Sequence, residues 1–147
     1  MTRVALIDDH ESVRLGLEAA LARAGKDLVF SGATVAQYLG WRAGSRSAPA
    51  DVVVLDLTLG DGTTATGNVS RLVSDGSSVI IHSVADRPAA VREALMAGAA
   101  GVVSKSSPIG DVIAAIRTVA AGEHLDNVEG ASAVDGGAGV AGCSTGR

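Results

Sequence analysis

Five short apolar runs, rich in β-branched residues, constrain the fold of this chain more than any other feature. Each run is three or four residues long, and the clearest are apolar throughout instead of alternating with polar residues. Continuous apolar runs of this kind are typical of strands that are covered on both faces, as in a parallel sheet. The predicted strands are Val4–Ile7, Leu28–Phe30, Val52–Leu55, Val79–Ile81 and Gly101–Val103.

The segments between these runs carry apolar residues at helical spacing. The strongest stripes cover residues 13–24, which end before Gly25, and residues 109–119, which follow Pro108 and stop near Gly122. Weaker stripes lie at residues 35–39, 65–74 and 91–95. Five strands that alternate with five helices predict an α/β fold of the flavodoxin-like, doubly wound (βα)5 kind. Its five-stranded parallel sheet would have the order 2-1-3-4-5.

The last part of the chain has a different composition. Six of the 23 residues in the segment 125–147 are glycine, alanine and serine fill much of the rest, and no amphipathic stripe is visible. We therefore expect one folded domain over residues 1–124, followed by a flexible Gly/Ala-rich tail or linker over residues 125–147.

Charge and cysteine content exclude several classes of function. The chain has 12 Lys and Arg against 16 Asp and Glu, and this net charge of −4 disfavours a surface that binds nucleic acid directly. Its single cysteine cannot form an intrachain disulfide, which favours a cytoplasmic protein. The longest apolar run, Val112–Ile116, is far shorter than the roughly 20 residues of a membrane span, so we expect no membrane contact.

Three acidic residues follow predicted strands. Asp8 and Asp9 come directly after the first strand, and Asp56 comes directly after the third. In a parallel sheet of the predicted order these positions meet at one edge, where unpaired like charges resist ionisation. A bound Mg²⁺ relieves this repulsion, since it prefers carboxylate oxygens. Each acid alone could instead be an ordinary helix N-cap or loop residue.

A hydroxyl and an ammonium group are predicted at the same edge. Ser83 ends the fourth strand, and Lys105 follows the fifth. Together with a Mg²⁺ they would balance the charge of the three acids and leave donors for a phosphoryl group. Since the chain has only two lysines, Lys105 is a candidate site residue, although a solvated loop lysine is the simpler interpretation.

These residues, in this order, resemble the receiver domain of two-component response regulators. The resemblance covers residues 1 to about 124 and rests on Asp8-Asp9, on Asp56 after Val-Val-Val-Leu, on Ser83, and on Gly98-Ala-Ala-Gly-Val-Val-Ser-Lys105. The stretch from Ala114 to Leu125 is similar to receivers that precede a LuxR/NarL-type DNA-binding domain. The protein is thus expected to act in a phosphorelay that regulates transcription.

The resemblance also implies a role for each residue. Asp56 would accept a phosphoryl group from a sensor histidine kinase and form an aspartyl phosphate. Asp8, Asp9, Asp56 and the backbone carbonyl of Thr58 would bind Mg²⁺. Lys105 would neutralise charge on the phosphoryl oxygens, and Ser83 would bind the phosphoryl group and start a conformational switch.

The sequence departs from the family pattern in three places. The loop after Asp56 reads Leu-Thr-Leu-Gly60-Asp-Gly62, without the usual proline and in a shortened form. Val102 stands where the family often has a switching Tyr or Phe, which predicts weaker coupling between phosphorylation and output. No helix-turn-helix pattern follows residue 126, so DNA contact would need an output domain that this sequence does not include.

Two other functions remain as alternatives. The chain could be a pseudo-receiver, an interaction module that phosphorylation does not regulate. It could also be a phosphohydrolase of the haloacid-dehalogenase kind, but that family needs a second aspartate where Thr58 stands. Under the receiver interpretation the domain is not an enzyme beyond self-catalysed phosphorylation and dephosphorylation, and it could form a homodimer through its helices.

Overall fold

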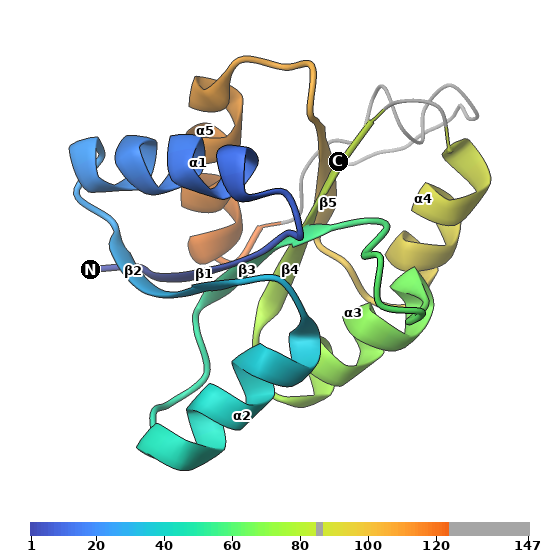
Figure 1. Ribbon diagram of the computed structural model, residues 1–147. Coiled ribbons are helices and arrows are strands. Elements are labelled where there is room, and N and C mark those ends of the chain that lie inside the picture. Colours follow the sequence, from blue (N-terminus) through green and yellow to red (C-terminus); the bar gives the residue numbers. More distant parts are fainter. Residues whose placement is uncertain (85–86, 124–147) are drawn as a thin grey trace.

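The computed structural model describes residues 1–84 and 87–123, which form a single parallel sheet with helices on both faces. The five strands have the order β2-β1-β3-β4-β5, as the sequence predicts, and every neighbouring pair is parallel (Figure 1). The strands are β1 (Arg3–Ile7), β2 (Asp27–Gly32), β3 (Val52–Asp56), β4 (Ser78–Ser83) and β5 (Gly101–Ser104).

Five helices connect the strands. They are α1 (Glu11–Arg23), α2 (Val35–Ser45), α3 (Ala65–Ser74), α4 (Pro88–Met96) and α5 (Ile109–Ala120). Helices α1 and α5 cover one face of the sheet, and α2, α3 and α4 cover the other (Figure 1). The predicted fold class is therefore confirmed, with strand and helix ends that differ from the prediction by a few residues.

Each face of the sheet has its own hydrophobic core. Because side chains alternate along a strand, β3 sends Val53 and Leu55 toward α2, α3 and α4, and Val52 and Val54 toward α1 and α5. The buried members of β1 and β4 divide between the two cores in the same way. This double coverage explains why the central strands carry continuous apolar runs instead of alternating apolar and polar residues.

Local sequence signals fix the ends of the helices. Thr34 caps α2 and Thr64 caps α3, each accepting a hydrogen bond of 3.0 Å from the backbone N–H three residues later. Pro88 stands in the first turn of α4, where its missing N–H costs nothing. After α4, Gly98 has a φ of +118°, a conformation that other residues rarely adopt.

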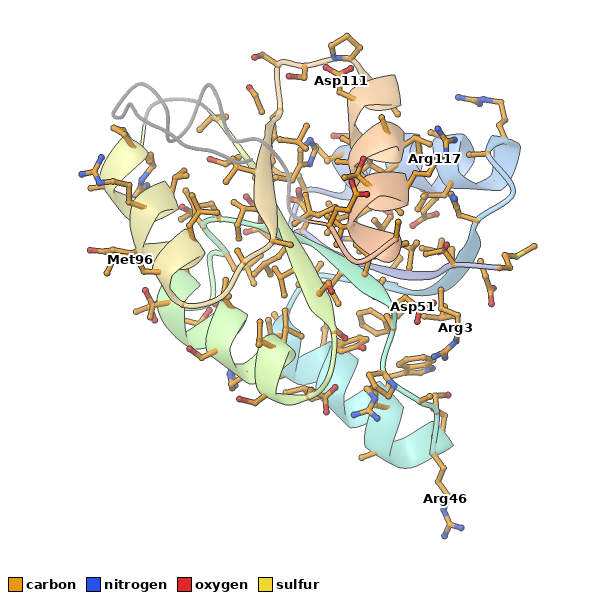
Figure 2. The ribbon with its side chains drawn as sticks, turned by 180° about the vertical axis from the view of Figure 1, so that it is seen from behind. Arg3, Arg46, Asp51, Met96, Asp111 and Arg117 are labelled. Atoms are coloured by element: carbon orange, nitrogen blue, oxygen red, sulfur yellow. The ribbon has the colours of Figure 1, made fainter. Side chains whose placement is uncertain are left out.

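Arg3 fastens the connection between α2 and β3 to the first strand. Its guanidinium donates to the carbonyls of Ala48 and Pro49 at 3.0 and 2.8 Å, and its backbone N–H donates to Asp51 Oδ2 at 2.8 Å. Figure 2 shows Arg3 and Asp51 close together, whereas Arg46 extends from the end of α2 away from the domain.

The three aromatic side chains of the chain form one cluster between β2 and α2. The ring of Phe30 lies 5.4 Å from that of Tyr38 and 5.7 Å from that of Trp41, and the rings of Tyr38 and Trp41 lie 5.9 Å apart. Tyr38 is fully buried, and its hydroxyl accepts a hydrogen bond of 2.9 Å from the backbone N–H of Ala50. The cluster therefore anchors the outer edge of the sheet.

The tail predicted over residues 125–147 lies outside the described residues. Within residues 1–84 and 87–123, no helix combines the length and the hydrophobicity that a membrane crossing requires.

Candidate functional site

The structure brings the acidic residues together at the carboxyl edge of the sheet. Asp8 and Asp9 follow β1 directly, and Asp56 is the last residue of β3, the strand next to β1. Asp8 is 3% exposed and Asp56 is 5% exposed, whereas Asp9 lies at the surface. Two of the carboxylates are thus held in a buried position where ionisation needs a nearby cation.

Lys105 provides positive charge at this edge. Its Nζ lies 3.1 Å from Asp8 Oδ2 and 3.2 Å from Asp56 Oδ1, so one ammonium group bridges the two buried carboxylates. Its backbone N–H donates a hydrogen bond of 2.7 Å to the carbonyl of Ser83 at the end of β4. The lysine is therefore held on a segment that is tied to the neighbouring strand, and it is not a solvated loop lysine.

His10 belongs to the same cluster, although its sequence position gave no metal-ligand spacing to indicate this. Its Nδ1 lies 2.9 Å from Asp8 Oδ1, 3.1 Å from Asp9 Oδ1 and 3.7 Å from Asp56 Oδ2. The only signal in the sequence is that His10 directly follows the acid pair. His10 is the N-cap residue of α1, and a hydrogen bond between its Nδ1 and Asp8 Oδ1 holds the ring beside the carboxylates.

The loop after β3 contacts two of the acids through its backbone. The Thr58 N–H donates a long hydrogen bond of 3.4 Å to Asp56 Oδ1, and the Gly60 N–H donates one of 3.0 Å to Asp9 Oδ2. The loop therefore borders the cluster although it lacks the proline that is usual in the family pattern. The role predicted for the Thr58 carbonyl stays a prediction.

Ser83 and Val102 lie on the neighbouring strands. Ser83 is buried at the end of β4, and its hydroxyl donates to the carbonyl of Val84 at 2.7 Å. The hydroxyl is thus engaged by its own chain. Val102 is half-buried in β5 and packs against the core on the α2, α3 and α4 side.

The cluster shifts the pKa values of its members. Burial and the nearby Asp8 carboxylate raise the pKa of Asp56, against the opposing effect of Lys105. Burial also raises the pKa of Asp8, but hydrogen bonds from the His10 backbone and from Lys105 outweigh it, so the net pKa of Asp8 is lowered. The two carboxylates raise the pKa of Lys105 despite its partial burial, which keeps its ammonium group charged.

The donor set fits a divalent cation. One ligand atom each from Asp8, Asp9, His10 and Asp56 lies within 4.8 Å of every other. Asp56 Oδ2 is buried and accepts no hydrogen bond within the described part of the chain. An unsatisfied carboxylate oxygen of this kind is costly in a protein interior, and a cation would satisfy it.

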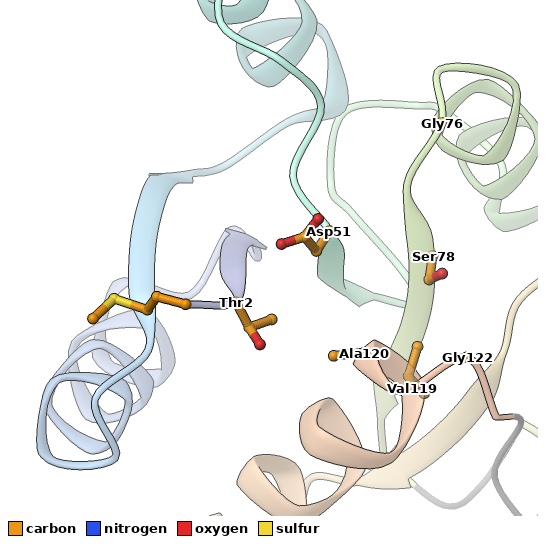
Figure 3. A pocket seen from close by; sticks show the side chains of 8 residues that line it. Thr2, Asp51, Gly76, Ser78, Val119, Ala120 and Gly122 are labelled. Atoms are coloured by element: carbon orange, nitrogen blue, oxygen red, sulfur yellow. The ribbon is translucent and has the colours of Figure 1, made fainter.

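A second hollow lies at the opposite edge of the sheet, where β3 and β4 begin and α5 ends (Figure 3). Asp51 is the one ionisable side chain in its lining, and its Oδ2 is already bonded to the backbone of Arg3. The lining of this hollow holds no cluster of ionisable side chains, so the carboxyl edge of the sheet is the candidate functional site.

Comparisons with known proteins identify the family of this chain. Residues 4–117 match the response regulator receiver domain family. The transcriptional regulatory protein LiaR of Bacillus subtilis is 36% identical over 125 residues, which cover 84% of this chain and 58% of LiaR. The transcriptional regulatory protein UhpA of Salmonella typhimurium is 38% identical over 125 residues, covering 83% of this chain and 60% of UhpA. The chain thus spans less than two thirds of the length of these relatives.

Solved structures give the same result. The chain superposes on a two-component response regulator of the LuxR family from Aurantimonas sp. SI85-9A1 with a TM-score of 0.73 at 28% sequence identity, covering 84% of this chain and 89% of that one. The family match, the curated relatives and the shared fold agree. This chain belongs to the response regulator receiver domain family, on its LuxR/NarL-type branch.

Proposed function

We propose that the domain accepts a phosphoryl group on Asp56 from the phosphohistidine of a sensor histidine kinase. The observation that carries this proposal is the state of the Asp56 carboxylate. Its Oδ1 is paired with Lys105 at 3.2 Å, while its buried Oδ2 accepts no hydrogen bond from the described residues. One oxygen is therefore positioned beside the Lys105 ammonium group, where it can act as the nucleophile, and the other is available to a metal ion.

In the transfer, Asp56 Oδ1 attacks the phosphorus atom and forms a P–O bond, while Oδ2 remains available to the metal ion. The P–N bond to the donor histidine breaks, and its electron pair stays on the ring nitrogen of the leaving imidazole. Lys105, which bridges Asp8 and Asp56, is close enough to hold a phosphoryl oxygen during this step. Positioning and charge neutralisation are the main contributions of the protein.

The carboxylates of Asp8, Asp9 and Asp56 and the backbone carbonyl of Thr58 would hold Mg²⁺. When bound, the ion would neutralise charge on the phosphoryl oxygens. The unsatisfied Asp56 Oδ2 supports this assignment, and so does the hydrogen bond that fixes Asp9 to Gly60.

The response to phosphorylation would begin at Ser83. To bind a phosphoryl group, the Ser83 hydroxyl must exchange its bond to the Val84 carbonyl for one to the phosphoryl oxygen. The backbone bond from Lys105 to Ser83 joins this movement to the end of β5. Together, α4, β5 and α5 would form the switching surface, with Val102 in the place of the usual ring.

The output would be transcriptional regulation, which the names of LiaR and UhpA support. We propose that residues 1–124 form the receiver domain and that DNA contact belongs to a LuxR-type domain outside this sequence. Leu15 on α1 and Ile109 on α5 are exposed and would suit a homodimer contact. The single cysteine fits a cytoplasmic protein, and the domain would be a signalling module rather than an enzyme.

The test is phosphorylation by acetyl phosphate or phosphoramidate in the presence of Mg²⁺, followed by intact-mass measurement. We expect a gain of one phosphoryl group that hydroxylamine removes. It should be absent in Asp56→Asn and present in Asp111→Asn, which alters an exposed acid in the first turn of α5. No mass gain would favour the pseudo-receiver. Steady release of phosphate from phosphate esters would favour a hydrolase, which membership of the receiver family does not support.

A further inference from the structure

The imidazole of His10 faces the three carboxylates that we assign to the metal. Its Nδ1 lies 2.9, 3.1 and 3.7 Å from one oxygen each of Asp8, Asp9 and Asp56. The side chain is 61% exposed, but the backbone N–H of His10 donates to Asp8 Oδ1 at 2.9 Å, which fixes the residue beside the site. The ring is therefore held at the site by its own backbone and by the hydrogen bond between Nδ1 and Asp8 Oδ1, which a bound ion would replace.

These separations suit donor atoms that share one ion. Two ligands bound at about 2.1 Å lie roughly 3.0 Å apart at right angles and roughly 3.4 Å apart at the tetrahedral angle. The distances of 2.9, 3.1 and 3.7 Å from Nδ1 are close to this range. The buried Asp56 Oδ2, which accepts no hydrogen bond within the described residues, points independently to a cation.

We propose that His10 is an additional metal ligand and that it shifts the preference of the site from Mg²⁺ toward first-row transition ions such as Co²⁺, Mn²⁺ and Zn²⁺. Oxygen ligands suit Mg²⁺, whereas imidazole nitrogen suits the transition ions. Three carboxylates with one imidazole thus form a mixed oxygen and nitrogen site. This inference rests on the proposed metal site but not on phosphoryl transfer.

The test compares Co²⁺ with Mg²⁺ in direct titrations of the unphosphorylated chain, without any phosphoryl donor. We expect His10→Gln to weaken Co²⁺ binding by about tenfold or more, while Mg²⁺ binding changes little. Asp27→Asn is the control, because it alters an exposed acid at the start of β2, at the edge of the sheet opposite to the site. It should leave both affinities unchanged.

A second measurement is independent of the variant. Co²⁺ is paramagnetic, so a directly bound His10 ring should give strongly shifted imidazole proton resonances in the wild-type NMR spectrum. Equal Co²⁺ affinity in wild type and His10→Gln, or the absence of shifted ring resonances, would overturn the proposal. If Mg²⁺-dependent phosphorylation of Asp56 persists in that case, only the role of His10 fails. If wild type binds neither ion, the metal site itself fails.

Discussion

The backbone N–H of Gly60 donates a hydrogen bond of 3.0 Å to the Asp9 carboxylate, 51 positions earlier in the chain. This bond joins the loop after β3 to the end of β1 at the most exposed of the three acids. The loop therefore reaches the carboxylate cluster through its main chain, and glycine allows the close approach.

Gly60→Ala should weaken Mg²⁺ binding several-fold with little change in stability. A Cβ at position 60 would lie 3.1 Å from Asp9 Oδ2, which is closer than most carbon contacts, so the mobile end of the Asp9 side chain must shift. Isothermal titration with Mg²⁺ would measure the change. Gly40→Ala, in α2, is the control, because its Cβ meets no atom within 4 Å and should stabilise the helix by about 0.5–1 kcal/mol. Equal Mg²⁺ affinity in both variants would contradict the prediction.

Lys105→Gln should reduce the rate of Asp56 phosphorylation by about a hundredfold or more, since it removes the fixed charge beside the reacting oxygen. It should also lower stability by about 3 kcal/mol, because it leaves two buried carboxylates without their partner. Stopped-flow phosphorylation and urea unfolding would measure the two effects. The other lysine provides the comparison: Lys26→Gln removes the same charge from the turn between α1 and β2 and should behave like wild type.

The pH dependence of stability should carry a signature of His82. This residue is buried in β4, and burial together with the nearby Lys105 lowers its pKa. Below the ordinary histidine pKa of about 6.5, the unfolded chain binds a proton that the folded chain resists. The free energy of unfolding should therefore fall as the pH drops through this region. In His82→Leu the fall should be smaller than in wild type. Urea unfolding at a series of pH values would measure this difference. If the free energy of unfolding falls equally in wild type and His82→Leu, the pH dependence does not come from His82.

Val102→Phe should strengthen the response of α4 to phosphorylation. Valine has no ring that can move into the space that Ser83 leaves, so we expect the wild-type response to be small. With Mg²⁺ and beryllium fluoride, a mimic of the phosphoryl group, the amide resonances of α4 should shift further in this variant than in wild type. Leu15→Phe, which adds a ring on the exposed side of α1, is the control. A full wild-type response would remove the reason for expecting weak coupling.

The fold could be predicted because both faces of the sheet are covered. The continuous apolar runs Val4–Ile7 in β1 and Val52–Leu55 in β3 leave few alternatives to a buried parallel strand. The predicted ends were less accurate, and β2 begins at Asp27 and ends at Gly32, beyond the apolar run from Leu28 to Phe30. Backbone pairing extends a strand past its apolar residues, because hydrogen bonding does not depend on side-chain polarity.

The site could be predicted in part. Strand order alone placed Asp8, Asp56 and Lys105 at one edge, because each stands at the carboxyl end of a parallel strand. The position of His10 could not be read from spacing, since it depends on how the first turn of α1 directs the ring. The hydrogen bond from the Ser83 hydroxyl to the Val84 carbonyl could not be predicted from the sequence either, because the acceptors near a hydroxyl depend on the folded structure.

The clustering of all three aromatic rings between β2 and α2 has a practical consequence for spectroscopy. Strand β2 forms one border of the sheet and β5 forms the other. The indole of Trp41 packs near β2 and therefore reports on the border opposite to the segment that carries Lys105. Intrinsic fluorescence and near-ultraviolet dichroism of this protein will follow the melting of that border. A chromophore introduced on α4, for example at the exposed Met96 (Figure 2), would be the suitable reporter of signalling.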